Sequence, residues 1–548
     1  MAEIDINTVL NDAQRDVIRE CKRRNMRSGG LSLPLGFGKT RTSICLGLHL
    51  SKKPMLVIVS KTLLAGWIDE ISKTFGPGFP YEIMHRSYLK DNYETWTPKD
   101  ETRLVLTTAE VLIDAFTTHQ IEDVMVRPTR PNAFGPIILE YVLSTVPYLP
   151  ADAFKGTGYI YTVKWGTVII DEIQRYTEVT TEKCRAVAAI CADYRWGLSG
   201  TMFDEPKLSR FLGFMIMLHI EKTPRTIPDM RIYLRVFSGL NAFVIKRDSN
   251  PVFVPPEYYE EIVSHNLDHY EGVVFKSLKT VLLELSRRAN EARFMHDVVG
   301  QRLYSAYCLA MITFLRQALI CPMIPVASMF CDMGDFQARS ELSEMAIAQF
   351  NKAGIDGYLE DERNTLSSRF RAVLGKVHKH STERCIVFSS FRSVTDMLMY
   401  HIKETGRDAI TISAGFTIEQ RRRVIVDFEN SANSVMVIPY DIGAEGLNLQ
   451  CASVVMLVDL WWNSAKSEQA IGRVFRPGQK APKVCVYIFV SNTYVEKEII
   501  KKNHVKANIL SQLKTGSSSL SIPKINMQSL CKLISLEETK AAMSDYRQ

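Results

Sequence analysis

The sequence predicts an α/β protein of two tandem lobes, each a parallel sheet flanked by helices, with a helical insertion between them. Two groups of short apolar segments carry this prediction. The first group is 54–60, 103–106, 168–170 and 194–198, and the second is 385–388, 435–438, 454–458 and 484–490. Such runs are typical of strands buried on both faces of a parallel sheet. The stretch between the groups, from about 205 to 362, has helical apolar periodicity.

Length and composition narrow the class of protein. A chain of 548 residues is long enough for about two to four domains. The net charge of +7 permits a nucleic-acid-binding face without requiring one. No apolar run approaches the roughly 20 residues that cross a bilayer. The eleven cysteines include no C-x-x-C pair of the zinc or redox type. We therefore expect a soluble, intracellular protein without a membrane partner.

The octet Leu33 to Thr40, read as LPLGFGKT, lies between an apolar approach and a helix-like run. Gly36 and Gly38 allow the backbone to curl so that its N–H groups surround a polyphosphate. Lys39 supplies a cation for the β- and γ-phosphates, and Thr40 a hydroxyl for Mg²⁺. The usual first glycine is replaced by leucine. An ordinary glycine-rich turn is therefore the alternative interpretation of the octet alone.

Polar residues near the octet and at the ends of the first strands are further candidates. Gln14 precedes the octet by about two dozen residues, and its amide can read an adenine edge; an exposed helical glutamine is the alternative. Lys61 and Thr108 follow the strands at 54–60 and 103–106, where open α/β sheets place their ligands. Trp67 lies on a helical apolar stripe, which favours a place in the core.

Two acids follow the strand at 168–170. Beside a phosphate loop, Asp171 would hold Mg²⁺ and Glu172 would accept a proton from the attacking water. An acidic strand end that begins a turn is the alternative. Later in the chain, Arg473 and Arg476 stand three residues apart, which predicts one helical face. They could neutralise the charge on a transferring γ-phosphoryl group, or belong to a solvated basic helix.

The order of these pieces resembles the Swi/Snf family of helicase-like, DNA-dependent ATPases in helicase superfamily 2, over about residues 10–499. LPLGFGKT resembles that family's D-E-M-G-L-G-K-T, and PMLVIVSKTLLAGWIDEI its next motif. DEIQ, GLSGT, FLRQALICP, IGAEGLNL and DLWWN stand where the family has similar segments. QAIGRVFRPGQ matches almost position by position. Gln174, Ala444 and Glu445 depart from the pattern.

The resemblance implies a domain organisation. An N-terminal RecA-like, ATP-binding lobe would cover residues 1–250, with an insertion at about 111–164. A helical insertion or linker region would cover 251–362, a second RecA-like lobe 363–500, and a C-terminal tail 501–548. No bromodomain, chromodomain or zinc finger is visible. The chain is therefore similar to an ATPase core without accessory modules, a form also carried by large DNA viruses.

The resemblance also implies a set of functional residues. The nucleotide-binding residues would be Gln14, Leu33, Pro34, Leu35, Gly36, Phe37, Gly38, Lys39, Thr40, Asp171, Glu172 and Gly446, with Mg²⁺ on Thr40 and Asp171. The catalytic residues would be Lys39, Glu172, Gln469, Arg473 and Arg476, the arginines completing the site when the lobes close. The duplex track would include Lys61, Thr108, Ser390, Asn448 and Trp462.

By the same resemblance, the chain would hydrolyse ATP with Mg²⁺ and translocate on double-stranded DNA to move or strip bound proteins in transcription, chromatin or repair. We expect a monomeric ATPase, alone or within a larger complex. We expect it in the nucleus or, for a viral protein, in the host nucleus, viral factory or virion. A strand-separating helicase or an RNA-activated ATPase shares the same core. A catalytically quiet nucleic-acid-binding transcription cofactor is the alternative of another class.

Overall fold

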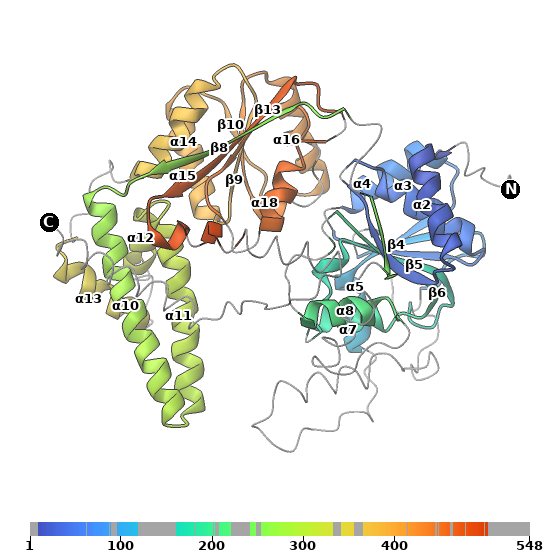
Figure 1. The fold of residues 1–548 in the computed structure, drawn as a ribbon, viewed down its shortest axis with the longest axis horizontal. Coiled ribbons are helices and arrows are strands. Elements are labelled where there is room, and N and C mark those ends of the chain that lie inside the picture. Colours follow the sequence, from blue (N-terminus) through green and yellow to red (C-terminus); the bar gives the residue numbers. More distant parts are fainter. Residues whose placement is uncertain are drawn as a thin grey trace. The chain divides into compact units, whose positions relative to one another are not determined.

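The computed structural model divides the chain into two compact units, which meet in sequence between Val254 and Pro255 (Figure 1). It describes residues 9–34, 36–61, 63–86, 88, 96–118, 160–179, 181–200, 202, 208–220, 242–247, 254–331, 341–355, 365–413, 415–443, 447, 449–460, 464–476, 478–497, 499–501 and 503. We call the unit before this boundary unit 1 and the one after it unit 2. Each is described by itself.

Unit 1 contains a sheet of seven strands in the order β3-β4-β2-β5-β6-β1-β7, with every pair parallel. In chain order the strands are β1 (Ser28–Ser32), β2 (Met55–Val59), β3 (Tyr81–Met84), β4 (Leu104–Thr108), β5 (Trp165–Asp171), β6 (Ala192–Ser199) and β7 (Val244–Lys246). Because the strands are parallel, their carboxyl ends share one edge of the sheet.

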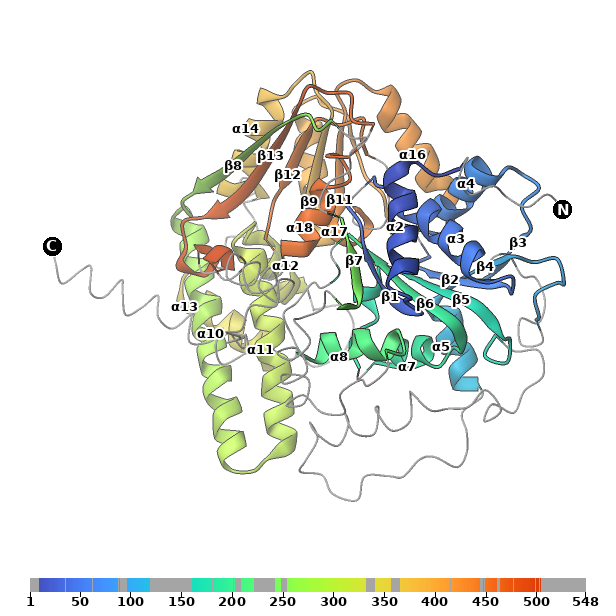
Figure 2. The ribbon, with the colours of Figure 1, turned by 45° about the vertical axis from the view of Figure 1, so that its right-hand side comes forward.

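Helices cover both faces of this sheet (Figure 2). One face packs on α2 (Asp12–Arg23), α3 (Lys39–Leu50) and α4 (Leu64–Phe75), and the other on α5 (Ala109–Thr118), α7 (Glu182–Ala188) and α8 (Leu208–Met217). Successive residues of β2 enter opposite cores: Leu56 and Ile58 join the second group of helices, Val57 and Val59 the first. This alternation explains why the whole strand is apolar.

Unit 2 contains a second parallel sheet of six strands, in the order β10-β11-β9-β12-β13-β8. The strands are β8 (Glu257–His265), β9 (Cys385–Ser389), β10 (Ala409–Ile410), β11 (Val435–Pro439), β12 (Val454–Leu457) and β13 (Lys483–Ser491). Residues 257–265 were predicted to belong to the helical insertion, and this was wrong. They form an edge strand with polar and half-exposed side chains, which no buried apolar run announces.

The helices of unit 2 also divide between the two faces of its sheet. One core contains residues of α10 (His269–Phe294), α11 (Val298–Ala318), α12 (Met323–Cys331), α13 (Glu341–Lys352), α14 (Ser368–Lys379) and α15 (Arg392–Glu404). The other core contains residues of α16 (Ile418–Asn430), α17 (Tyr440–Gly443) and α18 (Ser464–Ile471). The α10–α13 helices thus share a core with the second sheet rather than forming a separate body.

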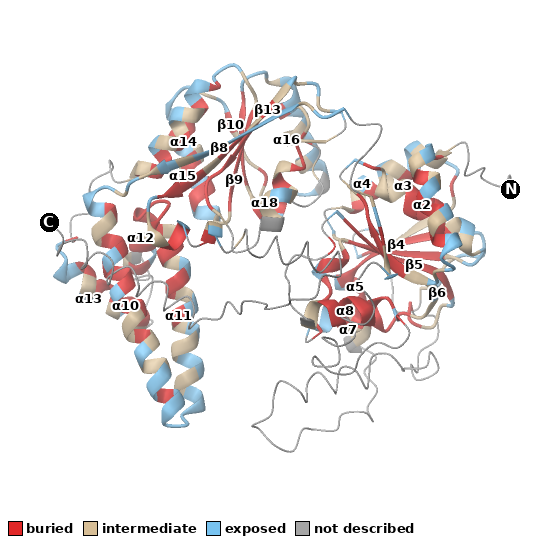
Figure 3. Cartoon of the chain, in the orientation of Figure 1, coloured by how far each residue is buried: buried red, intermediate tan, exposed pale blue. Residues whose placement is uncertain are grey.

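The two longest described helices, α10 and α11, form a hairpin whose far end is exposed (Figure 3). Asp268 caps α10: its side chain accepts from the N–H of Glu271, and the side chain of Glu271 accepts in turn from the N–H of Asp268. At the tip Phe294 and Val299 are 83% and 78% exposed. By length and composition alone α11 would qualify as a membrane span, a test that the core helix of a soluble protein also passes.

The predicted fold class, two tandem α/β lobes with parallel sheets and a helical segment between them, is confirmed. Every predicted strand lies within or overlaps an observed one. The exact domain boundaries stay a prediction. Most of the predicted insertion at 111–164, from 119 to 159, and the tail from 504 onward lie outside the described residues.

Candidate nucleotide site

The phosphate loop joins the end of β1 to the start of α3. Gly36 and Gly38 both have positive φ, 72° and 87°, the left-handed conformation that glycine adopts without strain. Gly38 is the N-cap of α3, so the loop delivers the chain directly to a helix N-terminus. The N–H groups of a helix's first turn and the helix dipole favour an anion at such a place. Leu35, predicted as part of the same loop, lies outside the described residues.

Lys39 is the first residue of α3 and folds back over the loop. Its Nζ donates to the carbonyl of Leu33 at 3.3 Å. The same nitrogen lies 3.3 Å from where a Cβ atom on Gly200 would be. Gly200, directly after the end of β6, therefore approaches the lysine closely. Thr40 follows in the first turn of α3 and is half-buried.

Asp171 ends β5 and Glu172 follows it, so both lie at the carboxyl edge of the same parallel sheet. One strand, β6, stands between β5 and β1. Burial, followed by repulsion from Glu172, raises the pKa of Asp171 to about 6. Glu172 has φ of 50°, an uncommon conformation for a residue with a side chain. Its Oε2 accepts a hydrogen bond from Nε2 of Gln174 at 2.5 Å. The predicted acid pair is therefore brought to the edge that carries Lys39.

Trp67 is a site residue that sequence reasoning assigned only to the core. It is 2% exposed, as predicted, but its indole Nε1 also donates to Oδ2 of Asp171 at 2.9 Å. The other oxygen, Oδ1, accepts from the N–H of Glu172 at 3.0 Å. Two donors thus orient the Asp171 carboxylate. The apolar spacing around Trp67 predicts that it lies on the inner face of α4, but it cannot predict the hydrogen-bond partner of the indole N–H.

Gln14 packs against the phosphate loop. Its Nε2 donates to the carbonyl of Phe37 at 2.8 Å, and its Oε1 accepts from the N–H of Asn11 at 3.1 Å. A Cβ atom on Gly38 would lie 2.3 Å from Nε2 of Gln14, so only glycine fits there without movement. Leu33 and Phe37 are buried and Pro34 is half-buried. The adenine-reading role of Gln14 stays a prediction.

The two predicted arginine fingers belong to unit 2 and do not share a helical face. Helix α18, which contains Gln469, ends at Ile471. Arg473 and Arg476 lie in the turns after it, where Arg473 N–H bonds to the carbonyl of Ala470, three residues back. The prediction of one helical face was wrong because these shorter-range bonds end the helix. Gly446, also predicted in unit 2, lies outside the described residues.

The two guanidinium groups are nevertheless close in an environment with little water. Arg473 is 7% exposed. Burial, followed by repulsion from Arg473, lowers the pKa of Arg476 to about 10. Its Nε has no hydrogen-bond partner within the part of the chain that the structure describes. Two partly desolvated cations that repel each other would gain from an anion between them.

The predicted duplex track is only partly supported by exposure. Lys61 is exposed after the end of β2. Thr108 is 0% exposed, so it does not present its hydroxyl to a duplex in this structure. It ends β4 inside the sheet, covered on both faces. Ser390 is half-buried after β9. Asn448 and Trp462 lie outside the described residues.

The donor set at the loop fits Mg²⁺. That ion is usually held by one or two carboxylates together with substrate phosphates. Thr40 and Asp171 provide a hydroxyl and a buried carboxylate. Among the described residues no group of three or more His, Cys, Asp or Glu side chains could hold a metal ion.

Two segments of the chain match models of known protein families. Residues 15–226 match the model of the SNF2-related domain, and residues 366–478 match that of the helicase conserved C-terminal domain. The first match contains the phosphate loop and the acid pair, and the second contains both arginines. The chain belongs to the SNF2 family of helicase-like proteins.

Individual SNF2 relatives span different shares of the chain. “Putative helicase 172L” of Invertebrate iridescent virus 6 is 24% identical over 94% of this chain and 91% of its own length. “ATP-dependent helicase fft1” of Schizosaccharomyces pombe is 31% identical over 69% of this chain, but only 43% of its own length is covered. A solved SWI2/SNF2 ATPase core from Sulfolobus solfataricus, in complex with dsDNA, is 18% identical with a TM-score of 0.34, and 96% of each chain is covered.

Proposed function

We propose that the chain is an ATP-driven translocase that is stimulated by double-stranded DNA and displaces proteins bound to it. The observation that carries the proposal is the convergence of Lys39, Asp171 and Glu172 at one edge of the sheet in unit 1. Membership of the SNF2 family supports ATP as the nucleotide, since relatives are named ATP-dependent helicases. The same activity fits a nuclear or viral setting.

We assign a role in ATP hydrolysis to the phosphate loop, the acid pair and Trp67 of unit 1. Backbone N–H groups at Gly36 to Lys39 would bind the phosphates, and Lys39 would add a positive charge. Thr40 and Asp171 would hold Mg²⁺, which neutralises phosphate charge when bound. Glu172 would orient the attacking water and accept its proton. Trp67 would keep the Asp171 carboxylate in position through its indole N–H.

In unit 2, Arg473 and Arg476 are proposed to stabilise the charge that develops on the γ-phosphoryl group, and Gln469 to assist them. Their support is the desolvated, mutually repulsive pair of guanidinium groups. An arginine that binds the transferring group is worth about 10³- to 10⁵-fold in turnover where it has been measured. The proposed duplex track retains Lys61, Ser390, Asn448 and Trp462, without Thr108.

ATP hydrolysis by the purified chain tests the proposal, alone and with duplex DNA, single-stranded DNA or duplex RNA. We expect duplex DNA to stimulate turnover most, and Lys39→Ala and Glu172→Gln to abolish it. The two variants have different consequences: Lys39→Ala should also weaken nucleotide binding, whereas Glu172→Gln should bind ATP and fail to hydrolyse it. The second step is removal of a protein bound to a DNA duplex, scored with and without strand separation.

The other outcomes identify the alternatives. Strongest stimulation by duplex RNA would replace the proposal with an RNA-activated ATPase. Separation of the strands during displacement would make the protein a helicase in the strict sense. No hydrolysis with any nucleic acid, together with intact DNA binding, would favour the catalytically quiet cofactor and contradict the proposal.

A further inference from the structure

One buried amide of unit 1, the side chain of Gln14, joins helix α2 to the phosphate loop. Gln14 is 4% exposed. Its Oε1 accepts from the N–H of Asn11 at 3.1 Å, and its Nε2 donates to the carbonyl of Phe37 at 2.8 Å. Phe37 is itself buried and lies 23 positions later in the chain. Both ends of the amide are therefore bonded inside unit 1, one to the start of the helix and one to the loop.

Helix capping accounts for only one of these two bonds. The Asn11 side chain accepts from the N–H of Gln14 at 2.9 Å, so the two residues form a capping box at the start of α2. A capping box needs only an acceptor at this position, which glutamate supplies equally well. In α10 the same position is filled by Glu271, and both of its carboxylate oxygens act as acceptors. In α2 an amide nitrogen is needed only for the bond to Phe37.

The bond to Phe37 orients a peptide unit of the phosphate loop. The carbonyl of Phe37 and the N–H of Gly38 belong to one trans peptide unit, so they point to opposite sides. By holding the carbonyl, Gln14 directs the N–H of Gly38 away from itself. In the part of the chain that the structure describes, this N–H donates to no acceptor, and Gly38 is half-buried. Because Gly38 is the N-cap of α3, the N–H lies where a helix favours an anion.

The adenine-reading role predicted for Gln14 needs an amide that a base can reach. An exposed glutamine could donate to one atom of the adenine edge and accept from another. The Gln14 amide is instead enclosed, and its Nε2 lies only 2.3 Å from where a Cβ atom on Gly38 would be. A base could bind this amide only after the side chain had left its place. In the observed position, Gln14 supports the loop.

We propose that Gln14 is a positioning residue for the polyphosphate and does not select the base. It holds the peptide between Phe37 and Gly38 in the orientation that offers the N–H of Gly38 to a phosphate oxygen. Its own amide would touch neither the phosphates nor the base. This inference rests on the proposed function, because it concerns the same nucleotide site. It predicts that loss of the Gln14 amide weakens the binding of every polyphosphate alike, with or without adenine.

The test measures binding to the full chain in the presence of Mg²⁺ by isothermal titration calorimetry, with ATP, GTP and inorganic tripolyphosphate as the three ligands. Gln14→Met keeps an unbranched side chain of similar length but removes the donor to Phe37. We expect this variant to raise all three dissociation constants by about 3- to 10-fold, the worth of one hydrogen bond. The ratio of the ATP and GTP dissociation constants should stay as in the wild type.

A second variant separates the loop contact from the helix cap. Gln14→Glu keeps an acceptor for the N–H of Asn11, and so preserves the capping box, but an ionised carboxylate cannot donate to Phe37. It should weaken the three ligands together and at least as strongly as Gln14→Met. If Gln14→Met fails to fold, Gln14→Glu decides the question by the same comparison.

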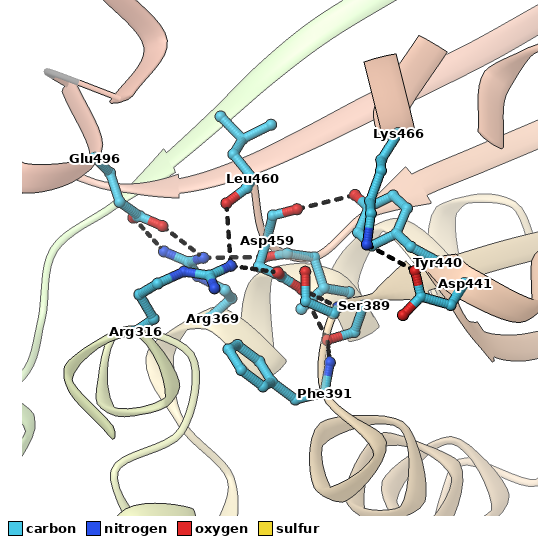
Figure 4. Close-up of polar contacts among 12 residues, drawn as sticks. Arg316, Arg369, Ser389, Phe391, Tyr440, Asp441, Asp459, Leu460, Lys466 and Glu496 are labelled. Atoms are coloured by element: carbon cyan, nitrogen blue, oxygen red, sulfur yellow. Dashed lines mark hydrogen bonds and ion pairs between the residues drawn. The ribbon is translucent and has the colours of Figure 1, made fainter. Parts of the chain in front are cut away.

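Unit 2 offers two matched controls. Gln420 fills the same capping-box position in α16, where its Oε1 accepts from the N–H of Thr417 at 2.8 Å. Gln420→Met therefore removes a cap without touching the phosphate loop. Ser389→Ala removes a buried hydrogen bond, since Oγ of Ser389 donates to Oδ1 of Asp459 at 2.7 Å (Figure 4). Both controls should keep the wild-type dissociation constants for all three ligands.

The remaining outcomes overturn the inference in distinguishable ways. A loss confined to ATP, with GTP and tripolyphosphate unaffected, would show that Gln14 reads the adenine edge. Wild-type affinities in the folded Gln14 variants would reduce Gln14 to a helix cap. An equal loss in Gln420→Met would assign the effect to general destabilisation. Each of these results leaves the proposed function intact, whereas a wild-type chain that binds none of the three ligands would contradict both proposals.

Discussion

At the residue scale, the geometry of the candidate site depends on contacts that cross the unit. Asp171 ends one strand, yet its carboxylate is oriented by the indole of Trp67 on α4, 104 positions earlier in the chain. The carboxylate is buried, so its orientation cannot be maintained by water. A hydrogen bond in such a place is worth about 0.5 to 1.5 kcal/mol, and more when the acceptor is charged.

The first prediction concerns this bond. Trp67→Phe keeps an aromatic ring in the core but removes the donor to Oδ2 of Asp171. We expect the turnover number for ATP hydrolysis to fall roughly five- to tenfold, the equivalent of about 1 to 1.4 kcal/mol. The measurement is steady-state hydrolysis under conditions in which duplex DNA and ATP both saturate.

Trp196→Phe is the matched control for that substitution. Trp196 is also fully buried in unit 1, and within the described residues its Nε1 has no hydrogen-bond partner. Its replacement should lower stability without a comparable fall in turnover. A similar fall in both variants would mean that Trp67 acts only through packing.

At the element scale, the junction of β8 with its neighbours shows how a strand end is tied down. His265 is the last residue of β8, and its Nε2 accepts from Nε of Arg369 on α14 at 3.4 Å. Arg369 in turn pairs with Glu496. His265 and His269 stand four apart in sequence, but this contact assigns His265 to packing rather than to a metal. Burial, followed by repulsion from Arg369, lowers the pKa of His265 to about 3.

The second prediction follows from this shift. An unfolded histidine has a pKa of about 6.5, so below that pH the unfolded state takes up a proton that the native state refuses. The contribution of neutral His265 to stability is therefore present above about pH 6.5 and is lost as the pH falls toward the folded value. We expect the wild type to lose more stability than His265→Gln between about pH 7 and about pH 5, measured by urea unfolding.

A second histidine variant serves as the control for His265→Gln. His378 on α14 is exposed, so His378→Gln should lose as much stability as the wild type over the same pH range. Equal losses in wild type and His265→Gln would contradict the assignment of His265 as a half-buried side chain that stays neutral in the native state.

At the scale of the whole molecule, each unit has its own buried cores. Leu106 on β4 and Leu457 on β12 are both 0% exposed and belong to different units. The site for ATP is proposed in unit 1. A ligand that binds one folded unit stabilises that unit by mass action, by about 2.7 kcal/mol at a hundred times its dissociation constant.

The third prediction is that the units unfold in separate transitions. Leu106→Ala and Leu457→Ala should each cost about 2 to 5 kcal/mol, and each should lower a different transition in calorimetry. ATP with Mg²⁺ should raise only the transition that Leu106→Ala lowers. A single transition that both variants shift equally would show that the two units unfold as one.

The fold class and most strands could be predicted from the amino-acid sequence, because buried parallel strands are continuous apolar runs that can be recognised without tertiary context. The sequence also identified the phosphate loop and the acid pair, since their spacing is local. Strand β8 was missed because its side chains are polar, and β1 because its Ser-Gly-Gly composition carries no apolar run. A Cβ atom on Gly29 in β1 would lie 2.7 Å from the carbonyl of Phe243, so glycine there serves a close backbone approach.

Which side chains act together could be seen only in the folded chain. The tertiary structure joined Trp67 to Asp171 and Gln14 to the phosphate loop, buried Thr108, and ended α18 before Arg473. It also assembled Arg316, Ser389 and Asp459 from three separate segments. Apolar periodicity records which face of an element is buried. The partner of a buried donor or acceptor depends on elements that are distant in the chain, and no local pattern contains that information.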